Sequence, residues 1–434
     1  MAIKISGSTI IDDGRNIVNA GVITATSAQV GSAVTISASG VSVTGVVSAT
    51  SYRGDGSSLT GVGVGASSNV NTTGIGTFGT LVATADLDIP NGTTEQRPSV
   101  PVTGSIRYNS QLNTLELYTG TEWGVIASIL PNADNRGVFG GGNNPTAVNT
   151  IDYITIATVG NATDFGDLTV ARVGLAACSS STRGVFGGGT TTPSTATQNV
   201  IDYITIATTG NATDFGDLTV ARRDLAACSS STRGVFGGGA TATTPTTILS
   251  NVIDYITIAS VGNATDFGDL TVARGNLAAC SSSTRGVFGG GGLPAAPSLT
   301  NTIDYITIAS TGNATDFGDL TVVRDRLAAC SSSTRGVFGG GYVSPANQNV
   351  LDYITIASTG NALDFGDLTL TRQNPAACSS STRGVFGGGL VSVSDQNVID
   401  YITIASIGDA TDFGDLTVAR RGIGACSNGH GGLS

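Results

Sequence analysis

The chain has 434 residues, of which 62 are glycine and 12% are charged, and its formal net charge is −11 at pH 7. A hydrophobic fraction of 40% excludes a solvated, disordered polymer and predicts a folded, β-rich protein built from small side chains. The acidic balance, with 20 scattered basic residues, argues against a nucleic-acid partner because neutralising phosphates requires clustered lysine and arginine.

The N-terminal sequence MAIKISGSTIIDDG has no charged segment followed by an apolar run. No stretch of about 18 apolar residues occurs further along the chain. We therefore expect neither a secretory signal nor a membrane anchor, and no membrane insertion.

Residues 1–88 are rich in Gly, Ser, Thr and Val, and short β-prone phrases echo one another there: GVITATS from Gly21, GVVSATS from Gly45 and GIGTFGT from Gly74. Each phrase has too few apolar residues for a core, so burial must come from stacked repeats or from other chains. We predict an elongated, β-rich fibrous region that forms a homotrimer. A flexible linker with β tendency is the alternative.

Residues 89–130 have a different composition. In QRPSVPVTGSIRYNSQLNTLELYTGTEWGV, apolar and polar residues alternate over Ile106–Tyr108 and Leu115–Tyr118, on either side of an Asn-bearing turn. Pro98 and Pro101 mark a boundary because proline cannot donate to a sheet ladder. We predict a small antiparallel β module.

Two phrases in these regions carry a resemblance, SATSYRGDGSSLTGV at 48–62 and QRPSVPVTGSIRYNSQLNTLELYTGTEW at 96–123. They resemble modules in tail-fibre and other virion structural proteins of tailed bacteriophages, especially those of marine cyanobacteria. The resemblance covers most of residues 1–125. It implies a trimeric virion appendage, made in the host cytoplasm, that binds other virion proteins of the tail or baseplate.

From Arg136 onward the chain repeats a unit of about 50 residues six times. The equivalent aspartates from Asp152 to Asp400 are separated by 50, 52, 50, 48 and 48 residues. Each unit holds four strand candidates, LAACSS, RGVFGG, IDYITIA and DFGDLTV. A period of this length with several short strands indicates propeller blades.

We therefore predict an all-β chain with a six-bladed β-propeller over residues 131–434. The series begins with the RGVFGGG strand at Arg136 and ends with the inner-strand sequence GIGACSN at 422–428. The C-terminal strand then completes the first blade and leaves no open edge. An open solenoid is the competing architecture and would need polar capping repeats. The repeated Tyr and Phe, such as Tyr153 and Phe165, are predicted core residues between blades.

The repeat also resembles a kelch repeat, whose hallmarks are a diglycine, then a Tyr, then a Trp, with an Arg nearby. Gly141 and Gly142, Tyr153, Phe165 and Arg172 match in that order. Phe stands where the kelch family has Trp, and 12 residues separate Tyr153 from Phe165, more than the usual kelch spacing. The resemblance implies a kelch-like propeller.

The chemistry-bearing residues predict no enzyme, no cofactor and no metal. The single histidine, His430, excludes Ser-His-Asp, Cys-His and His-metal arrangements, and RGVFGGG lacks the Lys-Ser/Thr of a P-loop. Acidic pairs such as Asp164 and Asp167 leave a Ca²⁺ site or a glycosidase pair open. Their sixfold repetition favours turn capping or pairing with the repeated Arg172.

Six cysteines fall one per repeat. Equivalent positions in packed sheets lie about 10 Å apart, which is too far for a disulfide. We predict reduced, buried core residues, and a ring of metal-binding thiolates is the alternative. The cysteines are Cys178, Cys228, Cys280, Cys330, Cys378 and Cys426.

Two sites in each repeat vary while the rest is nearly constant: the segment between the glycines and the Asp-Tyr, and two residues after the Arg that follows the fourth strand. Alternating strand direction places both loops on one face, and the constant SSSTRG and TGNATDFGD turns on the other. Drift in unconstrained loops and selection for contacts both explain the variation. Drift alone explains poorly why the exposed turns on the other face stayed the same, unless Asx-type hydrogen bonds from Asn161, Thr163 and Asp164 hold them. The candidate ligand-binding residues on the variable face are Asn143, Asn144, Thr190, Thr191, Arg223, Asp224, Thr241, Asn276, Asp325, Arg326, Tyr342, Gln373, Asn374, Asp395 and Arg421.

Two function classes follow. In the first, the protein is a non-enzymatic tail fibre whose N-terminal region attaches to the virion and trimerises, while the propeller binds a host-surface glycan or protein with avidity from three copies. In the second, it is a purely structural decoration of the tail, baseplate or head that binds other virion proteins. A depolymerase is a distant third class.

Overall fold

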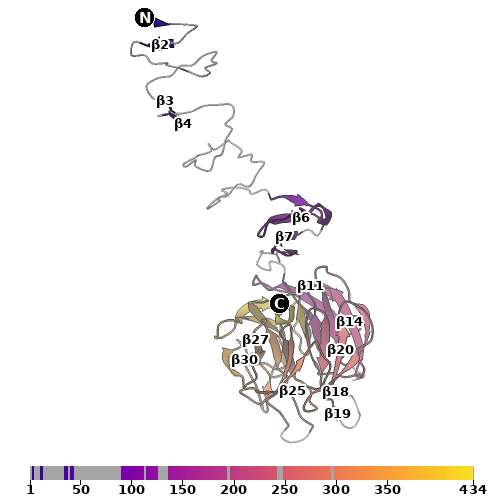
Figure 1. The fold of residues 1–434 in the computed structure, drawn as a ribbon. Helices are drawn as coiled ribbons and strands as arrows, with labels where there is room; N and C mark the ends of the chain where they lie inside the picture. Colours follow the sequence, from indigo (N-terminus) through magenta and orange to yellow (C-terminus); the bar gives the residue numbers. More distant parts are fainter. Residues whose placement is uncertain are drawn as a thin grey trace. The chain divides into compact units, whose positions relative to one another are not determined.

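The computed structural model describes residues 2–3, 10–12, 34–37, 40–43, 89–111, 114–125, 135–192, 196–241, 248–294 and 298–433 (Figure 1). The chain divides into two compact units, Met1–Leu87 and Asp88–Ser434. The predicted all-β class is confirmed, because the described residues hold strands and two 3₁₀ turns but no α-helix.

Two antiparallel strand pairs are described in the first unit. β1 (Ala2–Ile3) pairs with β2 (Ile10–Asp12), and β3 (Val34–Ser37) pairs with β4 (Gly40–Val43). The phrases GVITATS, GVVSATS, GIGTFGT and SATSYRGDGSSLTGV lie outside the described residues, as does the boundary predicted at residues 130–131. The trimeric fibre therefore stays a prediction.

The module predicted after residue 88 is a four-stranded sheet. Its elements are β5 (Asn91–Gly92), the 3₁₀ turn η1 (Thr94–Gln96), β6 (Ile106–Asn109), β7 (Thr114–Tyr118) and β8 (Trp123–Val125). The alternating segments form β6 and β7, as predicted, and β6, β7 and β8 are antiparallel. The module is not wholly antiparallel, however, because β5 pairs with β6 in parallel.

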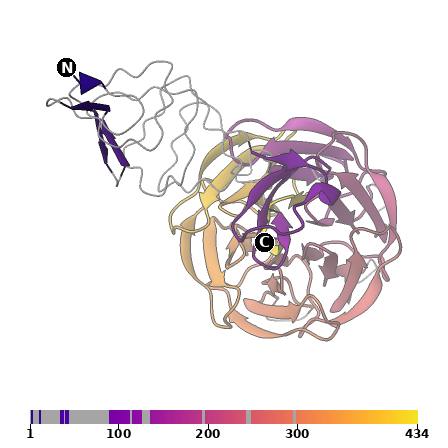
Figure 2. The same ribbon diagram turned by 45° about the horizontal axis from the view of Figure 1, so that its top comes forward.

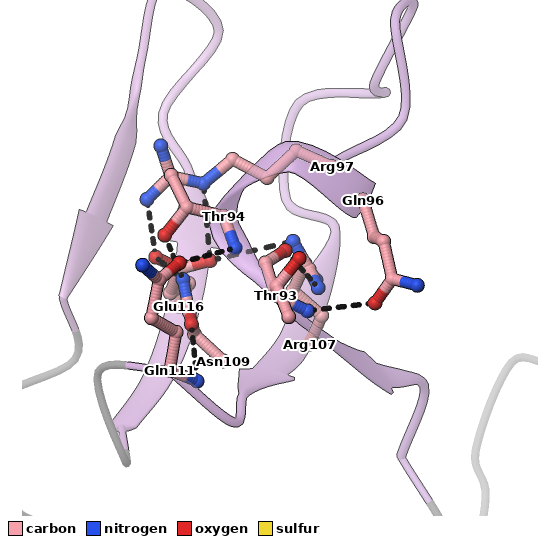
Figure 3. Close-up of polar contacts among 8 residues, drawn as sticks. All are labelled: Thr93, Thr94, Gln96, Arg97, Arg107, Asn109, Gln111 and Glu116. Atoms are coloured by element: carbon pink, nitrogen blue, oxygen red, sulfur yellow. Dashed lines mark hydrogen bonds and ion pairs between the residues drawn. The ribbon is translucent and has the colours of Figure 1, made fainter.

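A buried carboxylate organises this module (Figure 3). Glu116 has no exposed surface and forms an ion pair with Arg97. Asn109 Nδ2 donates to Glu116 Oε1 at 2.9 Å, and Arg107 Nη1 lies 3.7 Å from Glu116 Oε2. The hydrogen bond from Arg97 lowers the pKa of Glu116 below its usual value. The carboxylate therefore stays charged and ties β7 to β6 and to the chain after η1.

Apolar side chains of the same module face outward. Ile106 is 46% exposed although its neighbour Arg107 is buried, and Val100 and Val102 are 86% and 64% exposed. A sheet of this size rarely supplies a stable core of its own. The exposed apolar residues are therefore available for contacts with other chains.

Residues 135–433 form six four-stranded antiparallel sheets, which we call the six-sheet array. The first-position strands carry the AACS or GACS sequence: β12 (Ala176–Ser179), β16 (Ala226–Ser229), β22 (Ala278–Ser281), β26 (Ala328–Ser331), β32 (Ala376–Ser379) and β38 (Gly424–Ser427). The second-position strands carry RGVFG: β9 (Arg136–Gly140), β13 (Arg183–Gly187), β17 (Arg233–Gly237), β23 (Arg285–Gly289), β27 (Arg335–Gly339) and β33 (Arg383–Gly387).

The third-position strands carry the Asp-Tyr-Ile sequence: β10 (Thr150–Thr155), β14 (Val200–Thr205), β20 (Val252–Thr257), β24 (Thr302–Thr307), β30 (Val350–Thr355) and β36 (Val398–Thr403). The fourth-position strands carry DFGD: β11 (Thr163–Asp167), β15 (Thr213–Asp217), β21 (Thr265–Asp269), β25 (Thr315–Asp319), β31 (Leu363–Asp367) and β37 (Thr411–Asp415). Three short hairpins project beyond the sheets: β18 (Ala240–Thr241) with β19 (Ile248–Leu249), β28 (Tyr342–Val343) with β29 (Ala346–Asn347), and β34 (Leu390–Val391) with β35 (Ser394–Asp395).

The repeats begin with a second-position strand, β9, and end with a first-position strand, β38. This offset determines which strands form the first sheet. Five sheets take their four strands in chain order, whereas the sheet that holds β9, β10 and β11 takes β38 from the C-terminal end, in the order β11-β10-β9-β38. The predicted pairing of the last inner strand with the first unit is confirmed. First-position strands contact one another in succession, and β38 also contacts β12, so the contacts return to the starting sheet (Figure 2).

The hydrophobic core lies between neighbouring sheets and consists of six equivalent clusters. In one cluster, Val138 and Phe165 of the first sheet pack against Phe186 and Ile204 of the next. Phe165 and its equivalents are 2% exposed, as predicted for core residues. The prediction is met only in part for the tyrosines, because Tyr153 packs against its cluster but is half-buried.

The repeated tyrosine joins the aromatic core to an arginine. The Tyr153 and Phe165 rings meet edge to face at 5.9 Å, and the Arg136 guanidinium lies 4.6 Å from the Tyr153 ring centroid. Arg136 also donates to the carbonyl of Ile206 in the next sheet at 3.1 Å. The tyrosine therefore positions an arginine that crosses between sheets.

Buried ion pairs also cross between sheets. Arg172 Nη2 donates to Asp202 Oδ2 at 2.7 Å and to the carbonyl of Phe186 at 3.1 Å. Arg172 Nη1 donates to the carbonyls of Val200 and Gly188. The prediction that Arg172 pairs with Asp164 or Asp167 is wrong, because the arginine points into the following sheet. The equivalent pairs are Arg222–Asp254, Arg274–Asp304, Arg324–Asp352, Arg372–Asp400 and Arg420–Asp152.

The constant TGNATDFGD turns are held by contacts between sheets, whereas the SSSTRG turns are held locally, as where Ser180 Oγ accepts the backbone N–H of Arg183 at 3.1 Å. Asn161 Oδ1 accepts the backbone N–H of Asp415 at 3.0 Å, and Asn211 Oδ1 accepts that of Asp167 at 3.1 Å. The Gly160 N–H donates to the carbonyl of Phe413 in the preceding sheet. The expectation of local capping at Asn161 is therefore wrong, and sheet packing explains why the TGNATDFGD turns do not vary.

The six cysteines are free and buried, as predicted. Burial raises the pKa of Cys280 and Cys426 to about 12, so the thiols stay protonated. Each sulfur faces a glycine of a second-position strand in a neighbouring sheet: a Cβ added at Gly286 would lie 2.6 Å from Cys228 Sγ. The glycine is required there because a side chain would overlap the sulfur.

This contact predicts the effect of a paired substitution. Gly286→Ala would force the added methyl group into Cys228 and lower the free energy of unfolding by about 1–3 kcal/mol, the usual cost of overpacking. Adding Cys228→Ala removes the sulfur and should recover most of the lost free energy of unfolding. Denaturant unfolding is followed by circular dichroism, because the single tryptophan, Trp123, lies outside the array. A double variant as unstable as Gly286→Ala would contradict the contact.

Candidate functional site

The two variable sites of the repeats lie next to each other in space. An antiparallel bridge joins Val173, which follows one sheet, to Thr190 in the hairpin region of the next. The same bridge recurs at Arg223 with Ala240, Gly275 with Gly292, Asp325 with Tyr342, and Gln373 with Leu390. Figure 1 places β18 and β19 at one end of the array and the C-terminus at the other. Both variable sites thus share one face, as predicted, which we call the variable face.

A cycle of six backbone hydrogen bonds lies at the centre of this face. The second residue after each repeated Arg donates its backbone N–H to the carbonyl of the equivalent residue in the preceding unit. In the first unit, this residue donates to its equivalent in the last unit. The bonds, with distances of 2.7–3.2 Å, run from Asp224 to Gly174, Asn276 to Asp224, Arg326 to Asn276, Asn374 to Arg326, Gly422 to Asn374 and Gly174 to Gly422.

The backbone in this cycle is left-handed. Gly174 and Gly422 have φ of 70° and 63°, which glycine adopts without strain. Asp224, Asn276, Arg326 and Asn374 have φ of 54–56°. Asp and Asn are the side chains best tolerated there, whereas arginine has no local hydrogen bond that compensates for the cost. Arg326 therefore occupies a strained position.

Side chains of this cycle open into a polar hollow of about 450 Å³. Seven predicted site residues line it, together with Ala240, Leu249 and Leu390, which sequence reasoning did not single out although their loops were known to vary. The seven are Arg223, Asp224, Asn276, Arg326, Gln373, Asn374 and Arg421.

Each arginine of the polar hollow is paired with an aspartate. Arg223 Nη1 lies 2.7 Å from Asp224 Oδ2, and Arg421 Nη1 lies 2.6 Å from Asp395 Oδ1. Arg326 Nε lies 3.7 Å from Asp325 Oδ2. An aspartate thus lies within 4 Å of each arginine, and Asp224 is the one of the three aspartates that also lines the hollow.

Burial shifts two of these acids, Asp224 and Asp325, toward the neutral form. It raises the pKa of Asp224, although the Arg223 and Arg326 charges oppose the shift. It raises the pKa of Asp325 to about 6, against the opposing charge of Arg326 and with a contribution from the charge of Asp224. Asp325 Oδ1 is buried and has no hydrogen-bond partner among the described residues.

A second hollow of about 580 Å³, the side hollow, shares one wall with the polar hollow. Arg326 and Gln373 line both hollows, and Tyr342 lines the side hollow. The Arg326 guanidinium lies 5.4 Å from the Tyr342 ring centroid, and Arg326 Nη1 donates to Gln373 Oε1 at 2.7 Å. Arg326 is therefore fixed between the two hollows by a ring and an amide.

Seven predicted site residues do not line either hollow. Two of them, Asp325 and Asp395, pair with arginines that do. The other five lie further from the hollows. Asn143 is buried and donates its backbone N–H to the carbonyl of Arg421, and Asn144 follows it. The hydroxyls of Thr190 and Thr241 donate hydrogen bonds to backbone carbonyls of their own loops, at Ala196 and Ile248 respectively. Thr191 lies in the same loop as Thr190. These residues shape the variable face but are not gathered at its centre.

The opposite end of the array is closed by His430, for which the sequence suggested no role. A narrow cavity of about 50 Å³ is lined by the six first-position strands and His430. His430 Nδ1 accepts the Gly432 N–H at 3.1 Å, and Nε2 lies 3.1 Å from the carbonyl of Ser179. These contacts fit the neutral ring with its proton on Nε2. Burial lowers the pKa of His430 to about 4.

Among the residues that the structure describes, no group of three or more His, Cys, Asp or Glu side chains is placed to hold a metal ion. None of the described segments is a helix of sufficient length and apolarity to span a bilayer. The chain matches no protein-family model and no curated protein. Geometry and residue chemistry therefore carry the functional argument.

The His430 contacts predict a pH-dependent stability. Because the folded-state pKa is about 4 and that of a free histidine is about 6.5, the unfolded chain binds this proton more readily. The stability from the neutral ring is complete above pH 6.5 and is lost as the pH falls to about 4. We expect His430→Ala to melt below the wild type at pH 7.5, with the gap shrinking towards pH 4.

Melting followed by circular dichroism at several pH values tests this. Titration of Asp325 changes stability in the opposite direction, since its raised pKa favours the folded state below pH 6. Asp325 is present in both the wild type and His430→Ala, so its effect cancels in the difference between their melting temperatures. A gap that stays constant from pH 7.5 to 4 would show that His430 does not titrate as described.

Proposed function

We propose that residues 135–433 are a closed six-bladed β-propeller of the kelch-like type, with one four-stranded sheet per blade. The contacts between the last and first units support this, because they repeat those between consecutive units. Arg420 pairs with Asp152 at 2.8 Å, as Arg172 does with Asp202 at 2.7 Å. The serine hydroxyls of the first-position strands form a cycle in which Ser179 Oγ donates to the carbonyl of Ser427.

The function we propose is that of a non-enzymatic phage virion appendage, a tail fibre whose variable face binds a host-surface glycan or protein. One observation carries this proposal: five of the six units, which are nearly identical elsewhere, place different side chains around one hollow of about 450 Å³. A constant scaffold with differing residues at one place is the arrangement expected of a binding module.

The constancy of the turns on the opposite face does not by itself favour binding over drift, because packing between sheets and local hydrogen bonds explain it. The contacts among the variable residues are the stronger support. Arg421 pairs with Asp395 and Arg326 donates to Gln373, in each case between different variable loops. Residues that drifted independently would not be expected to form such matched pairs.

The N-terminal part supports attachment and assembly. Its phrases resemble virion modules, and the small sheet exposes Val100, Val102 and Ile106. We propose that copies of this chain associate into a homotrimer through the N-terminal regions, which also bind other tail or baseplate proteins in the virion. A purely structural decoration would use the same assembly without a host ligand.

Adsorption to cells separates these functions. Labelled full-length chain is added at micromolar concentration to a panel of marine cyanobacterial strains. We expect it to coat at least one strain and to block adsorption of a phage that infects that strain. The matched control carries glycine at Asp224, Asn276, Arg326 and Asn374, and it should not bind. Failure of the folded wild-type chain to bind any strain of the panel would contradict a host-recognition function.

A further inference from the structure

We infer that the polar hollow binds a neutral saccharide and that Arg326 is its main specificity-determining residue. This inference rests on the proposed function and names the ligand class of the same face. It concerns the hollow lined by Asp224, Asn276, Arg326, Gln373 and Asn374.

The size and lining of the polar hollow fit a polyhydroxylated ligand. Its volume of about 450 Å³ lies within the range of small-molecule sites, but its lining differs from the usual apolar one. Carboxylate, amide and guanidinium groups converge there from five consecutive units. Asp side chains accept hydrogen bonds, Arg side chains donate them, and Asn and Gln side chains do both. Each sugar hydroxyl can donate and accept a hydrogen bond, so this lining can bind neighbouring hydroxyls of a sugar in pairs.

The ion pairs argue for a neutral ligand. Arg223, Arg326 and Arg421 each have an aspartate partner, so a sulfate or phosphate group would compete with a carboxylate for each guanidinium. An anionic ligand would have to displace an aspartate from its arginine. A neutral sugar can instead use the donors and acceptors that the ion pairs leave free.

The side hollow supplies the apolar surface that sugar recognition also needs. Tyr342 lines it, and Arg326 lies 5.4 Å from the ring centroid. Pro345 and Val391 line the same hollow. The C–H face of a sugar ring can pack on such a surface while its hydroxyls reach Arg326 and Gln373. A saccharide of two or more units would extend across the shared wall.

Backbone strain marks the residues that contribute specificity. Glycine is the least strained residue in the left-handed cycle and is present at Gly174 and Gly422. Arg326 has φ of 56° and lines both hollows. Strained residues of this kind cluster at functional sites. The repeats thus hold a natural substitution, Arg326→Gly, that removes the side chain and relieves the backbone.

The experiment measures binding of full-length chain to immobilised neutral, carboxylated and sulfated oligosaccharides. We expect a neutral oligosaccharide to bind with a Kd below about 1 mM, a modest affinity of the kind that avidity would raise. Arg326→Gly and Asn374→Gly should each weaken that binding at least tenfold without lowering the melting temperature. The control, Val159→Thr, should bind as the wild type does, because Val159 is exposed on the opposite face and threonine occupies its place at Thr209.

Binding confined to charged glycans, or glycine variants that bind neutral glycans as well as the wild type, would overturn the inference. Competition on cells separates it from the proposed function. If the chain coats cells but neutral oligosaccharides neither bind nor compete, the inference fails and the host-recognition function stands. If neutral oligosaccharides bind but no cell is coated, the host-recognition function fails and the site assignment stands.

Discussion

The buried arginine–aspartate pair between consecutive sheets is the interaction on which the rest of residues 135–433 depends. Each arginine is fully buried, and removing one partner of a buried pair costs about 3–5 kcal/mol because the other charge is left uncompensated. Arg172 reaches into the next sheet to satisfy both Asp202 and backbone carbonyls, and Thr169 donates to the same carboxylate. A single substitution in the pair would therefore leave a charge in the core. This explains why the LTVAR and IDY segments change so little between copies.

The two residues that follow each buried arginine are held by backbone contacts, which allows the side chains of the variable face to differ from unit to unit. The residue directly after each buried arginine is held by a bridge to the next hairpin region, and the following one by the cycle of backbone hydrogen bonds. Backbone atoms make these contacts, so they place few limits on the side chains. Six equal positions can thus hold glycine, Asp, Asn or Arg, and the central hollow becomes asymmetric although its scaffold is symmetric.

Much of this fold could be predicted from the sequence, because a fifty-residue period and alternating apolar residues report strands and their order directly. The offset between Arg136 and the final GACS strand was enough to predict that β38 joins β9. The partner of Arg172 could not be predicted, since Asp164, Asp167 and Asp202 all recur with the same period and only the packing of sheets distinguishes them. The site was predicted as a face, and seven of its residues do meet; Thr190 and Thr241 do not, because their hydroxyls satisfy local carbonyls. His430 gave no signal beyond being the only histidine, because its role depends on where the C-terminal turn lies.

The proposed closure of the ring of sheets can be tested with a pair of double-mutant cycles. Coupling energies between Arg420 and Asp152 and between Arg222 and Asp254 are measured by alanine substitution in the full chain, with unfolding followed by circular dichroism. The two pairs are equivalent in geometry, but only the first joins the last unit to the first. Closure predicts coupling energies that agree within about 0.5 kcal/mol. A coupling near zero at Arg420–Asp152, with the Arg222–Asp254 coupling intact, would show that the ring is open and would contradict the account.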